Sequence, residues 1–445
     1  MNRLDPVLFA GIAEVIITPA VGARLIGFAA RSGPSERVRD DLTATALVLD
    51  DGATRAVILA CDLCFIHPTM LRTVRRLVAE RSGIPPERLL VCCSHTHSGP
   101  TTYVHSGGWA LDRAYVAYLP YLLAGAAAAA VRSLQPARLR VGHSTVEIGA
   151  NRRRRRADGR VEMAVHDGGP IDPEVTVLRV EAEAGTPVAT LVNYACHPVV
   201  LGPRSLSISA DYVGAMRRVV TQATGAPCLF VQGACADINP IGGGHADDAT
   251  VVALGAALGQ AALTAWQTAS AVNGTPLATE VRELLLPLAV SWNPPGADRL
   301  EIALSQLYRD GAEAPLLTPE GISVVMDERL PWAAELRQEE STGRQGITVE
   351  VSVLRAGSVA VVGIAGEPFV ETGLAIKRAS PVPHTIIAGY TNGCGGYLPP
   401  RAAYPEGGYE VDEAYRWYRL PAPPEPGCAE RVVEEALNLL DAAGR

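Results

Sequence analysis

The sequence predicts an α/β protein in which a mixed central sheet is flanked by helices. Short apolar runs alternate with helical patterns along the chain, which is typical of strands covered by helices. The composition is that of a folded chain, with 48% hydrophobic and 19% charged residues among 445. A chain of this length can bury roughly 75% of the surface that its unfolded form exposes.

The elements follow one another in a regular order. Residues 68–82 show the helical spacing clearly, because Leu71, Val74 and Val78 fall on one face. Apolar runs that are too short for most helices predict strands at residues 57–61, 89–93, 187–196, 228–232, 359–364 and 385–388. Longer patterns predict further helices at residues 113–133, 210–224 and 251–266, and a last one that ends near residue 378.

The alternation of strand and helix patterns is interrupted between residues 276 and 346, where Pro-rich turns accompany two helical patterns. We therefore predict a single domain over residues 1–445, with a lobe or insertion at about residues 276–346. The sequence contains no internal repeat and does not determine the oligomeric state, and a homo-oligomer is compatible with it.

Composition excludes several classes of partner. The net charge of −8 argues against nucleic acid, and the basic run at residues 152–156 is expected as a whole to be a solvated loop. Asp5 and Pro6 interrupt the N-terminus, and apolar segments such as residues 121–131 are short, so we expect no signal peptide and no stable membrane anchor. Nine scattered cysteines suit a reducing cytoplasm, and Cys61 and Cys64 are expected in the core.

Polar residues follow the apolar runs at the points where the predicted strands end. They come after Cys93, at His197, after Gln232, at Glu367 and after Gly389. Ligands of open α/β sheets bind beyond the carboxyl ends of strands. Five such ends, far apart in sequence, therefore predict one common site, and we expect a metal there.

The residue types at these ends suit zinc, which takes imidazole nitrogen and carboxylate oxygen and leaves a position for water in catalytic sites. His95 and His97 are two residues apart, so they point the same way on an extended strand end. Each candidate also has a structural interpretation. The histidines, including the buried His197, can be satisfied by hydrogen bonds, and Glu367 can face a helix dipole. Residues 390–397 can be a simple glycine-rich loop.

The ordered set of motifs resembles the N-terminal catalytic domain of the neutral/alkaline non-lysosomal ceramidase family. The resemblance covers about residues 8–410, and no single motif decides it. The matching pieces are SHTHSGP at 94–100, Asn151-Arg152, NYACHP at 193–198, QGACADINP at 232–240, GEPF at 366–369 and GYTNGCGGYLPPRAAYPEGGYE at 389–410.

The resemblance implies specific roles for individual residues. The implied zinc ligands are His95, His197, Glu367 and Tyr397. His97 would be a catalytic histidine beside the metal, and Arg152 and Tyr409 would contact the reacting group. Asp237 matches an aspartate of the family's GDVSP-like segment, and both Asp237 and Asn239 are predicted site residues.

Three departures from the family weaken ceramide itself as the substrate. Asn239 stands where the ceramidases carry a serine, and we expect neither a secretory signal nor the family's C-terminal immunoglobulin-like domain. The aromatic content of 5% gives no hint of a large lipid-binding surface. We predict a zinc-dependent hydrolase that cleaves the amide bond of a small N-acyl substrate. The alternatives are a zinc esterase or lactonase on a small polar substrate, and a descendant that only binds a metal or ligand.

Overall fold

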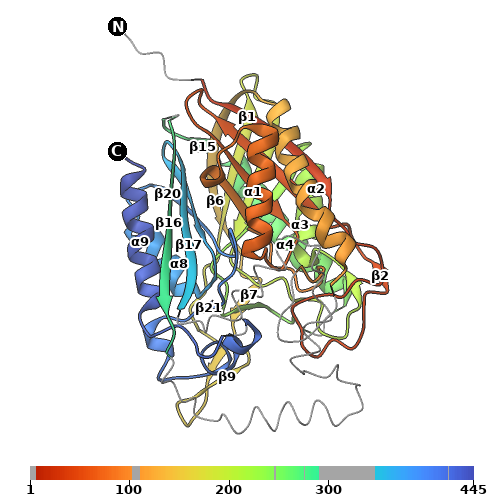
Figure 1. Cartoon of the computed structure of the whole chain (residues 1–445), viewed down its shortest axis with the longest axis vertical. Coiled ribbons are helices and arrows are strands. Elements are labelled where there is room, and N and C mark those ends of the chain that lie inside the picture. Colours follow the sequence, from red (N-terminus) through yellow and green to blue (C-terminus); the bar gives the residue numbers. More distant parts are fainter. Residues whose placement is uncertain (1–6, 103–110, 245–246, 275, 290–345, 419) are drawn as a thin grey trace.

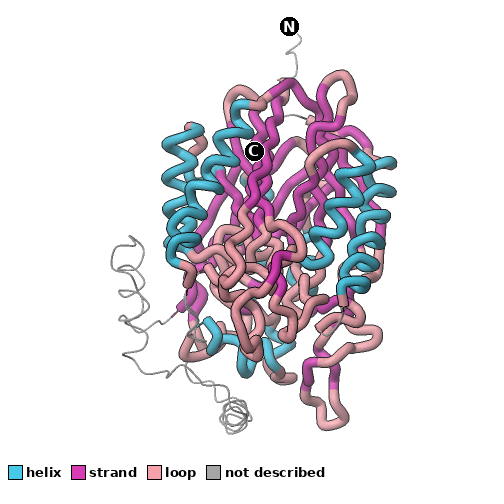
Figure 2. The backbone as a smooth tube through the Cα atoms, turned by 90° about the vertical axis from the view of Figure 1, so that its right-hand side faces the viewer, coloured by secondary structure: helices cyan, strands magenta, loops and turns pink. Residues whose placement is uncertain are grey.

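Two sheets pack face to face, and helices cover the outer face of each, so that the chain forms four layers (Figures 1 and 2). The computed structural model describes residues 7–102, 111–244, 247–274, 276–289, 346–418 and 420–445. The predicted α/β class, with a mixed central sheet flanked by helices, is confirmed.

The larger sheet has nine described strands in the order β13-β11-β10-β6-β1-β3-β4-β5, with β15 paired to β6. Two pairs, β4 with β5 and β11 with β13, are parallel, and the other pairs are antiparallel. The strands are β1 (Phe9–Ile16), β3 (Thr43–Asp50), β4 (Arg55–Cys61), β5 (Leu89–Cys93), β6 (Gln135–Thr145), β10 (Glu174–Ala182), β11 (Pro187–Tyr194), β13 (Cys228–Gln232) and β15 (Ser270–Ala271).

The smaller sheet has the order β16-β17-β18-β20 within the described chain. Its strands are β16 (Leu277–Pro287), β17 (Gly346–Ala356), β18 (Val359–Ile364) and β20 (His384–Ala388). β16 occupies the start of the segment predicted as a lobe and is an integral strand of this sheet. Residues 290–345 lie outside the described residues, so the lobe stays a prediction there.

Among the described residues, four helices cover the larger sheet and two cover the smaller one. The first group is α1 (Pro68–Ser82), α2 (Arg113–Arg132), α3 (Asp211–Thr224) and α4 (Asp248–Gln267), and the second is α8 (Val370–Ala379) and α9 (Cys428–Ala442). α1 begins where the His67 side chain accepts a hydrogen bond from the Thr69 amide, with Pro68 in the first turn. It ends at Gly83, whose φ of 68° suits glycine.

Four pairs of short strands organise the loops at one end of the sheets. They are β2 (Arg37–Val38) with β12 (Ser207–Ile208), β7 (Gly149–Asn151) with β14 (Ile238–Pro240), β8 (Arg153–Arg155) with β9 (Val161–Met163), and β19 (Glu367–Pro368) with β21 (Tyr397–Leu398). Short 3₁₀ segments span Pro86–Arg88, Arg401–Ala403 and Ala414–Tyr418, and a π-helical turn spans Tyr409–Glu413. Figure 2 shows the loops gathered at this end.

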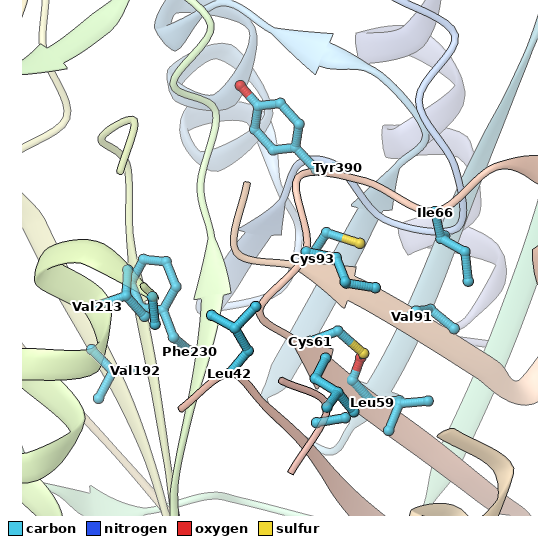
Figure 3. Close-up of a cluster of buried hydrophobic side chains, with 14 of the residues drawn as sticks. Leu42, Leu59, Cys61, Ile66, Val91, Cys93, Val192, Val213, Phe230 and Tyr390 are labelled. Atoms are coloured by element: carbon cyan, nitrogen blue, oxygen red, sulfur yellow. The ribbon is translucent and has the colours of Figure 1, made fainter. Parts of the chain in front are cut away.

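The predicted apolar runs are strands that are buried on both faces. In β4, Val57 and Leu59 pack toward the helices, whereas Ile58 and Ala60 pack toward the smaller sheet. Figure 3 shows the helix-side core, where Leu59 lies with its neighbours from several elements. Because neither face meets water, both sets of alternating positions must be apolar.

Two helices of the larger sheet's outer layer are long and strongly apolar. α2 and α4 have 20 residues each and are apolar enough to cross a membrane by length and composition. Both nevertheless pack on the larger sheet, α2 through residues such as Leu119 and Leu123 and α4 through residues such as Leu258 and Ala262. Helices that pack on a protein core can be as long and as apolar as membrane-spanning helices, so these two helices are only weak evidence for a membrane segment.

The segment after β20 joins the two outer strands of the larger sheet. The Gly389 amide donates to the Gln232 carbonyl at the end of β13 (2.9 Å), and the Asn392 amide donates to the Val91 carbonyl in β5 (2.9 Å). The Cys93 amide donates to the Tyr390 carbonyl (3.2 Å). Strand ends that are far apart in sheet order therefore meet at one place.

Candidate active site

A cavity of about 370 Å³ lies beyond these strand ends. Its wall is mainly apolar and aromatic, and the polar groups gather in one part of it. It is lined by Ile26, Gly27, Phe28, Ala29, Ala30, Cys64, Phe65, His95, His97, Arg152, Met163, Val199, Pro203, Asn239, Glu367, Tyr397, Tyr409, Trp417 and Tyr418. The low aromatic content of the whole chain concealed this concentration of rings in one cavity.

His95 follows β5 and is held in a strained backbone conformation. Its φ is 65°, which is uncommon for a residue with a side chain and is often found at functional sites. Its Nδ1 donates to the Cys64 carbonyl at 2.8 Å, so Nε2 carries the lone pair of the ring. The ring stacks on Tyr390 with centroids 3.9 Å apart. Burial lowers the pKa of His95 to about 3, which favours the neutral imidazole that metals bind.

His197 follows β11 and is completely buried. Its Nδ1 donates to the Cys235 carbonyl at 2.6 Å, which again leaves Nε2 with the lone pair. No described residue forms a hydrogen bond with this buried Nε2 atom. Burial, with the nearby Arg152 charge, lowers the pKa of His197 to about 3. A buried nitrogen without a hydrogen-bond partner destabilises the fold. We therefore infer that His197 Nε2 binds a ligand such as a metal ion.

Glu367 lies between the two imidazoles. Its Oε2 is 3.5 Å from His95 Nε2 and 3.6 Å from His197 Nε2. The Tyr390 hydroxyl donates to Oε2 at 3.3 Å, and the Tyr418 hydroxyl donates to Oε1. The pairing of β19 with β21 places Tyr397 directly beside Glu367.

These donors fit a divalent cation. One ligand atom from each of His95, His197 and Glu367 lies within 4.8 Å of the others. Both Nδ1 atoms are fixed by carbonyls, which is how metal-binding histidines are usually oriented. Cys64, His95 and His97 also satisfy the distance criterion. However, burial raises the pKa of the Cys64 thiol well above its usual value, which disfavours the thiolate that metal binding needs.

His97 lies against this group. Its Nε2 is 3.2 Å from His95 Nε2, and no described residue is a hydrogen-bond partner of its buried Nδ1. Gly27 packs on the ring, and an added Cβ would lie 2.3 Å from His97 Cγ at a φ of 106°. Glycine is therefore required there. Burial lowers the pKa of His97 well below its usual value.

Arg152 lines the cavity, and each of its three nitrogens donates a hydrogen bond to another residue. Its Nε donates to Glu410 (2.8 Å), its Nη1 to Asn239 Oδ1 (3.2 Å) and its Nη2 to the Tyr397 hydroxyl (3.0 Å). Burial alone would lower the pKa of Arg152, but Tyr397 and Glu410 raise it well above its usual value. Arg153 donates to the other oxygen of Glu410 at 2.6 Å. The arginine run predicted to be solvated thus begins with two buried members.

The remaining predicted residues differ in position. Tyr409 lines the cavity, with its ring 5.8 Å from that of Tyr397. Asp237 is buried outside the lining, where it accepts hydrogen bonds from the Asn151 side chain (2.7 Å) and the Val370 amide (2.9 Å). This arrangement supports the orienting role that the sequence left open for Asp237.

Several site residues were not predicted from the sequence. Glu410 had a visible signal, because it follows Tyr409 in the motif and a buried arginine needs an anionic partner. Tyr418 and Phe28 lie outside every motif, and Tyr390 lies inside one as an apparent loop residue. Arg31, which donates to the His97 carbonyl at 2.8 Å, was also missed.

The fold and the donor set define the class of protein, an α/β scaffold with a candidate metal centre at the strand ends. Residues 9–270, more than half of the chain, match the family model described as neutral/alkaline non-lysosomal ceramidase, N-terminal. The chain belongs to this family, and the predicted resemblance is confirmed.

Two solved structures have a similar fold. One is described as a ceramidase complexed with C2, with 18% identity and a TM-score of 0.73, covering 98% of this chain and 75% of that chain. The other is the neutral ceramidase from Pseudomonas aeruginosa, with 19% identity and a TM-score of 0.73, covering 99% and 75%. A search of curated proteins found no match.

Proposed function

We propose that this protein is a zinc-dependent hydrolase that cleaves the amide bond of N-acyl substrates. The observation that carries the proposal is the buried Nε2 of His197, which has no hydrogen-bond partner among the described residues and lies beside His95 and Glu367, two residues that line the cavity. Membership of the ceramidase family supports hydrolysis of an amide.

His95, His197 and Glu367 would hold the zinc ion, with Tyr397 as the fourth ligand. Two imidazoles with oxygen donors are a typical catalytic zinc set. When bound, zinc supplies a Lewis acid and lowers the pKa of water to near neutrality. The Tyr397 oxygen accepts a hydrogen bond from Arg152, which stabilises negative charge on that oxygen.

The other residues bind the substrate and move the proton. His97 lies against the proposed zinc ligands, with its Nε2 3.2 Å from that of His95, and would accept a proton and deliver it to the leaving amine. The Tyr409 hydroxyl lies in the cavity wall near Tyr397, where it can donate to the reacting group. The wall is mainly apolar, and polar contacts are stronger in surroundings of low dielectric constant.

The cavity supports a neutral substrate with an apolar portion. Phe28, Phe65 and Trp417 contribute aromatic wall, which suits a hydrocarbon or aryl group. Arg152, the cation that lines the cavity, is already paired with Glu410, so it does not require an anionic substrate. We propose apolar N-acyl amides as the substrate class, without specificity for ceramide.

We also propose a cytoplasmic location, with a small-molecule amide as the partner and neither nucleic acid nor a stable membrane anchor. All nine cysteines are free thiols, and eight of them are buried. Thiols persist in reducing compartments, which supports this location.

Metal analysis and substrate hydrolysis test the proposed function together. Purified protein should contain about one zinc per chain and should hydrolyse 4-nitroanilides of fatty acids. His197→Ala should lose both zinc and activity, because the ion loses a buried ligand. The matched control is His143→Ala, since His143 lies on β6 and outside the cavity lining. A His197→Ala protein with full zinc content and rate would contradict the ligand assignment.

A further inference from the structure

Asn239 is a polar residue of the cavity wall whose position is fixed by backbone pairing. It lies in β14, where it is the register partner of Ala150 in β7. Its side chain lines the cavity and forms a hydrogen bond with Arg152, the guanidinium Nη1 donating to Oδ1 at 3.2 Å.

The chemistry of Arg152 determines which way the amide faces. A guanidinium has only donors, so the oxygen of the Asn239 amide must face it and the NH₂ group must point away. Within the described parts of the chain, no acceptor binds the Asn239 Nδ2 atom, and this atom is not among the buried unpaired ones. The Asn239 side chain therefore offers an unused donor at the cavity.

The Asn239 side chain shares the Arg152 guanidinium with Tyr397, one of the proposed zinc ligands. The two terminal nitrogens of Arg152 bind Asn239 Oδ1 and the Tyr397 hydroxyl respectively. Glu410, which is buried, fixes the third nitrogen at 2.8 Å. Asn239 and Tyr397 are thus neighbours on one immobilised guanidinium, and Tyr397 is the strand partner of Glu367.

We propose that the Asn239 Nδ2–H donates a hydrogen bond to the carbonyl oxygen of the substrate amide as negative charge develops on that oxygen. The inference rests on the proposed amide hydrolysis. A fixed neutral donor near the metal ligands stabilises such charge without the reorganisation that water would need. The side chain has no nucleophile, so its contribution is this hydrogen bond.

Three substitutions separate donation to substrate from positioning of Arg152. Asn239→Asp keeps an acceptor for Arg152 but removes the donor, Asn239→Ser keeps a hydroxyl donor and acceptor, and Asn239→Ala removes both. On a 4-nitroanilide, whose amine part has no hydroxyl, we expect Asn239→Asp and Asn239→Ala to lower kcat by roughly 10²-fold, as for other oxyanion donors. Asn239→Ser should retain more activity than either. KM should change less than kcat, and rates are expressed per bound zinc.

The outcomes distinguish this inference from the proposed function. Absence of anilide hydrolysis by the zinc-loaded unsubstituted protein would overturn the proposed function itself. If that protein is active and Asn239→Asp matches its kcat, Asn239 only positions Arg152 and the inference is wrong. A loss confined to substrates with a hydroxyl on the amine part would also overturn it, because the donor would then bind that hydroxyl.

Discussion

Replacing Glu410 should destabilise the fold strongly, because one buried carboxylate serves two buried guanidinium groups. Its side chain is 2% exposed and accepts from Arg152 at 2.8 Å and from Arg153 at 2.6 Å. Removing one partner of a buried ion pair costs about 3–5 kcal/mol. Arg153 retains the Gly407 carbonyl at 2.8 Å, so the cost is not doubled. We expect Glu410→Ala to lower the free energy of unfolding by about 3–5 kcal/mol.

A graded series checks this magnitude. Glu410→Gln keeps the shape and one acceptor oxygen, so it should cost about 1.5–3 kcal/mol, the value of a charged hydrogen bond. The matched control is Glu162→Ala, which breaks an exposed pair with Arg154, whose side chain is 53% exposed. Such a pair is worth about 0–1 kcal/mol. Urea unfolding followed by circular dichroism measures all three proteins.

The stabilisation of the fold by the Glu410 carboxylate should decrease as the pH falls. Burial raises the pKa of Glu410, but Arg152 and Arg153 lower it more, so the pKa in the folded protein is below its ordinary value. A carboxylate with a depressed pKa stabilises the fold above its unfolded pKa of about 4.3. That stabilisation disappears as pH falls through the folded pKa. The difference in the free energy of unfolding between Glu410→Gln and the unsubstituted protein should therefore be largest near neutral pH and should decrease in acid. A difference below about 1 kcal/mol at neutral pH that does not change in acid would show that the Glu410 carboxylate does not stabilise the fold through these ion pairs.

Three further predictions concern the site. Tyr390→Phe removes the hydroxyl that donates to Glu367 and should weaken zinc binding by about 10–100-fold. Competition with a chelating dye measures this, and unchanged affinity would contradict it. Arg31→Met leaves the carbonyls of Ile26, His97 and Ser205 without their buried donor and should cost about 1–3 kcal/mol per group that water cannot reach. Urea unfolding tests this, and a loss below about 1 kcal/mol would show that these three hydrogen bonds do not stabilise the fold as argued. Chelation should lower the melting temperature, since a ligand at a thousandfold excess over Kd contributes about 4 kcal/mol. Added zinc should restore it, and a melting curve insensitive to both would exclude a structural contribution of the metal.

Among the strands that are buried on both sides, the sequence predicted those whose apolar runs are continuous. β18 and β13 were found with their observed bounds. β17 was missed, since Glu350 and Ser352 interrupt its apolar residues although both are buried. Glu350 is satisfied by Arg75 of α1 at 2.8 Å. Arg75 is 275 residues away from Glu350 in the chain, so the sequence around Glu350 does not indicate that this carboxylate has a buried partner.

For the candidate site too, the sequence indicates residues that belong to local patterns but not those that only the tertiary structure brings near. His95, His197 and Glu367 were predicted because strand ends are where α/β sheets bind ligands, and the structure brings them together. Tyr418 and Phe28 contribute to the cavity only because their segments fold back over it. Their sequence surroundings contain no metal-binding or catalytic pattern, so only the tertiary structure reveals them.

The bridge formed by Gly389 and Asn392 has a consequence for synthesis of the chain. Until the ribosome has released this segment, the nascent larger sheet leaves the edges of β5 and β13 without these partners. Unpaired strand edges promote association between chains. Glu367 and Tyr397 emerge at the same late stage, so a growing chain cannot assemble the proposed metal ligands before most of its last quarter is made. Pairing of these strand edges and completion of the candidate metal site therefore occur at the same stage of synthesis.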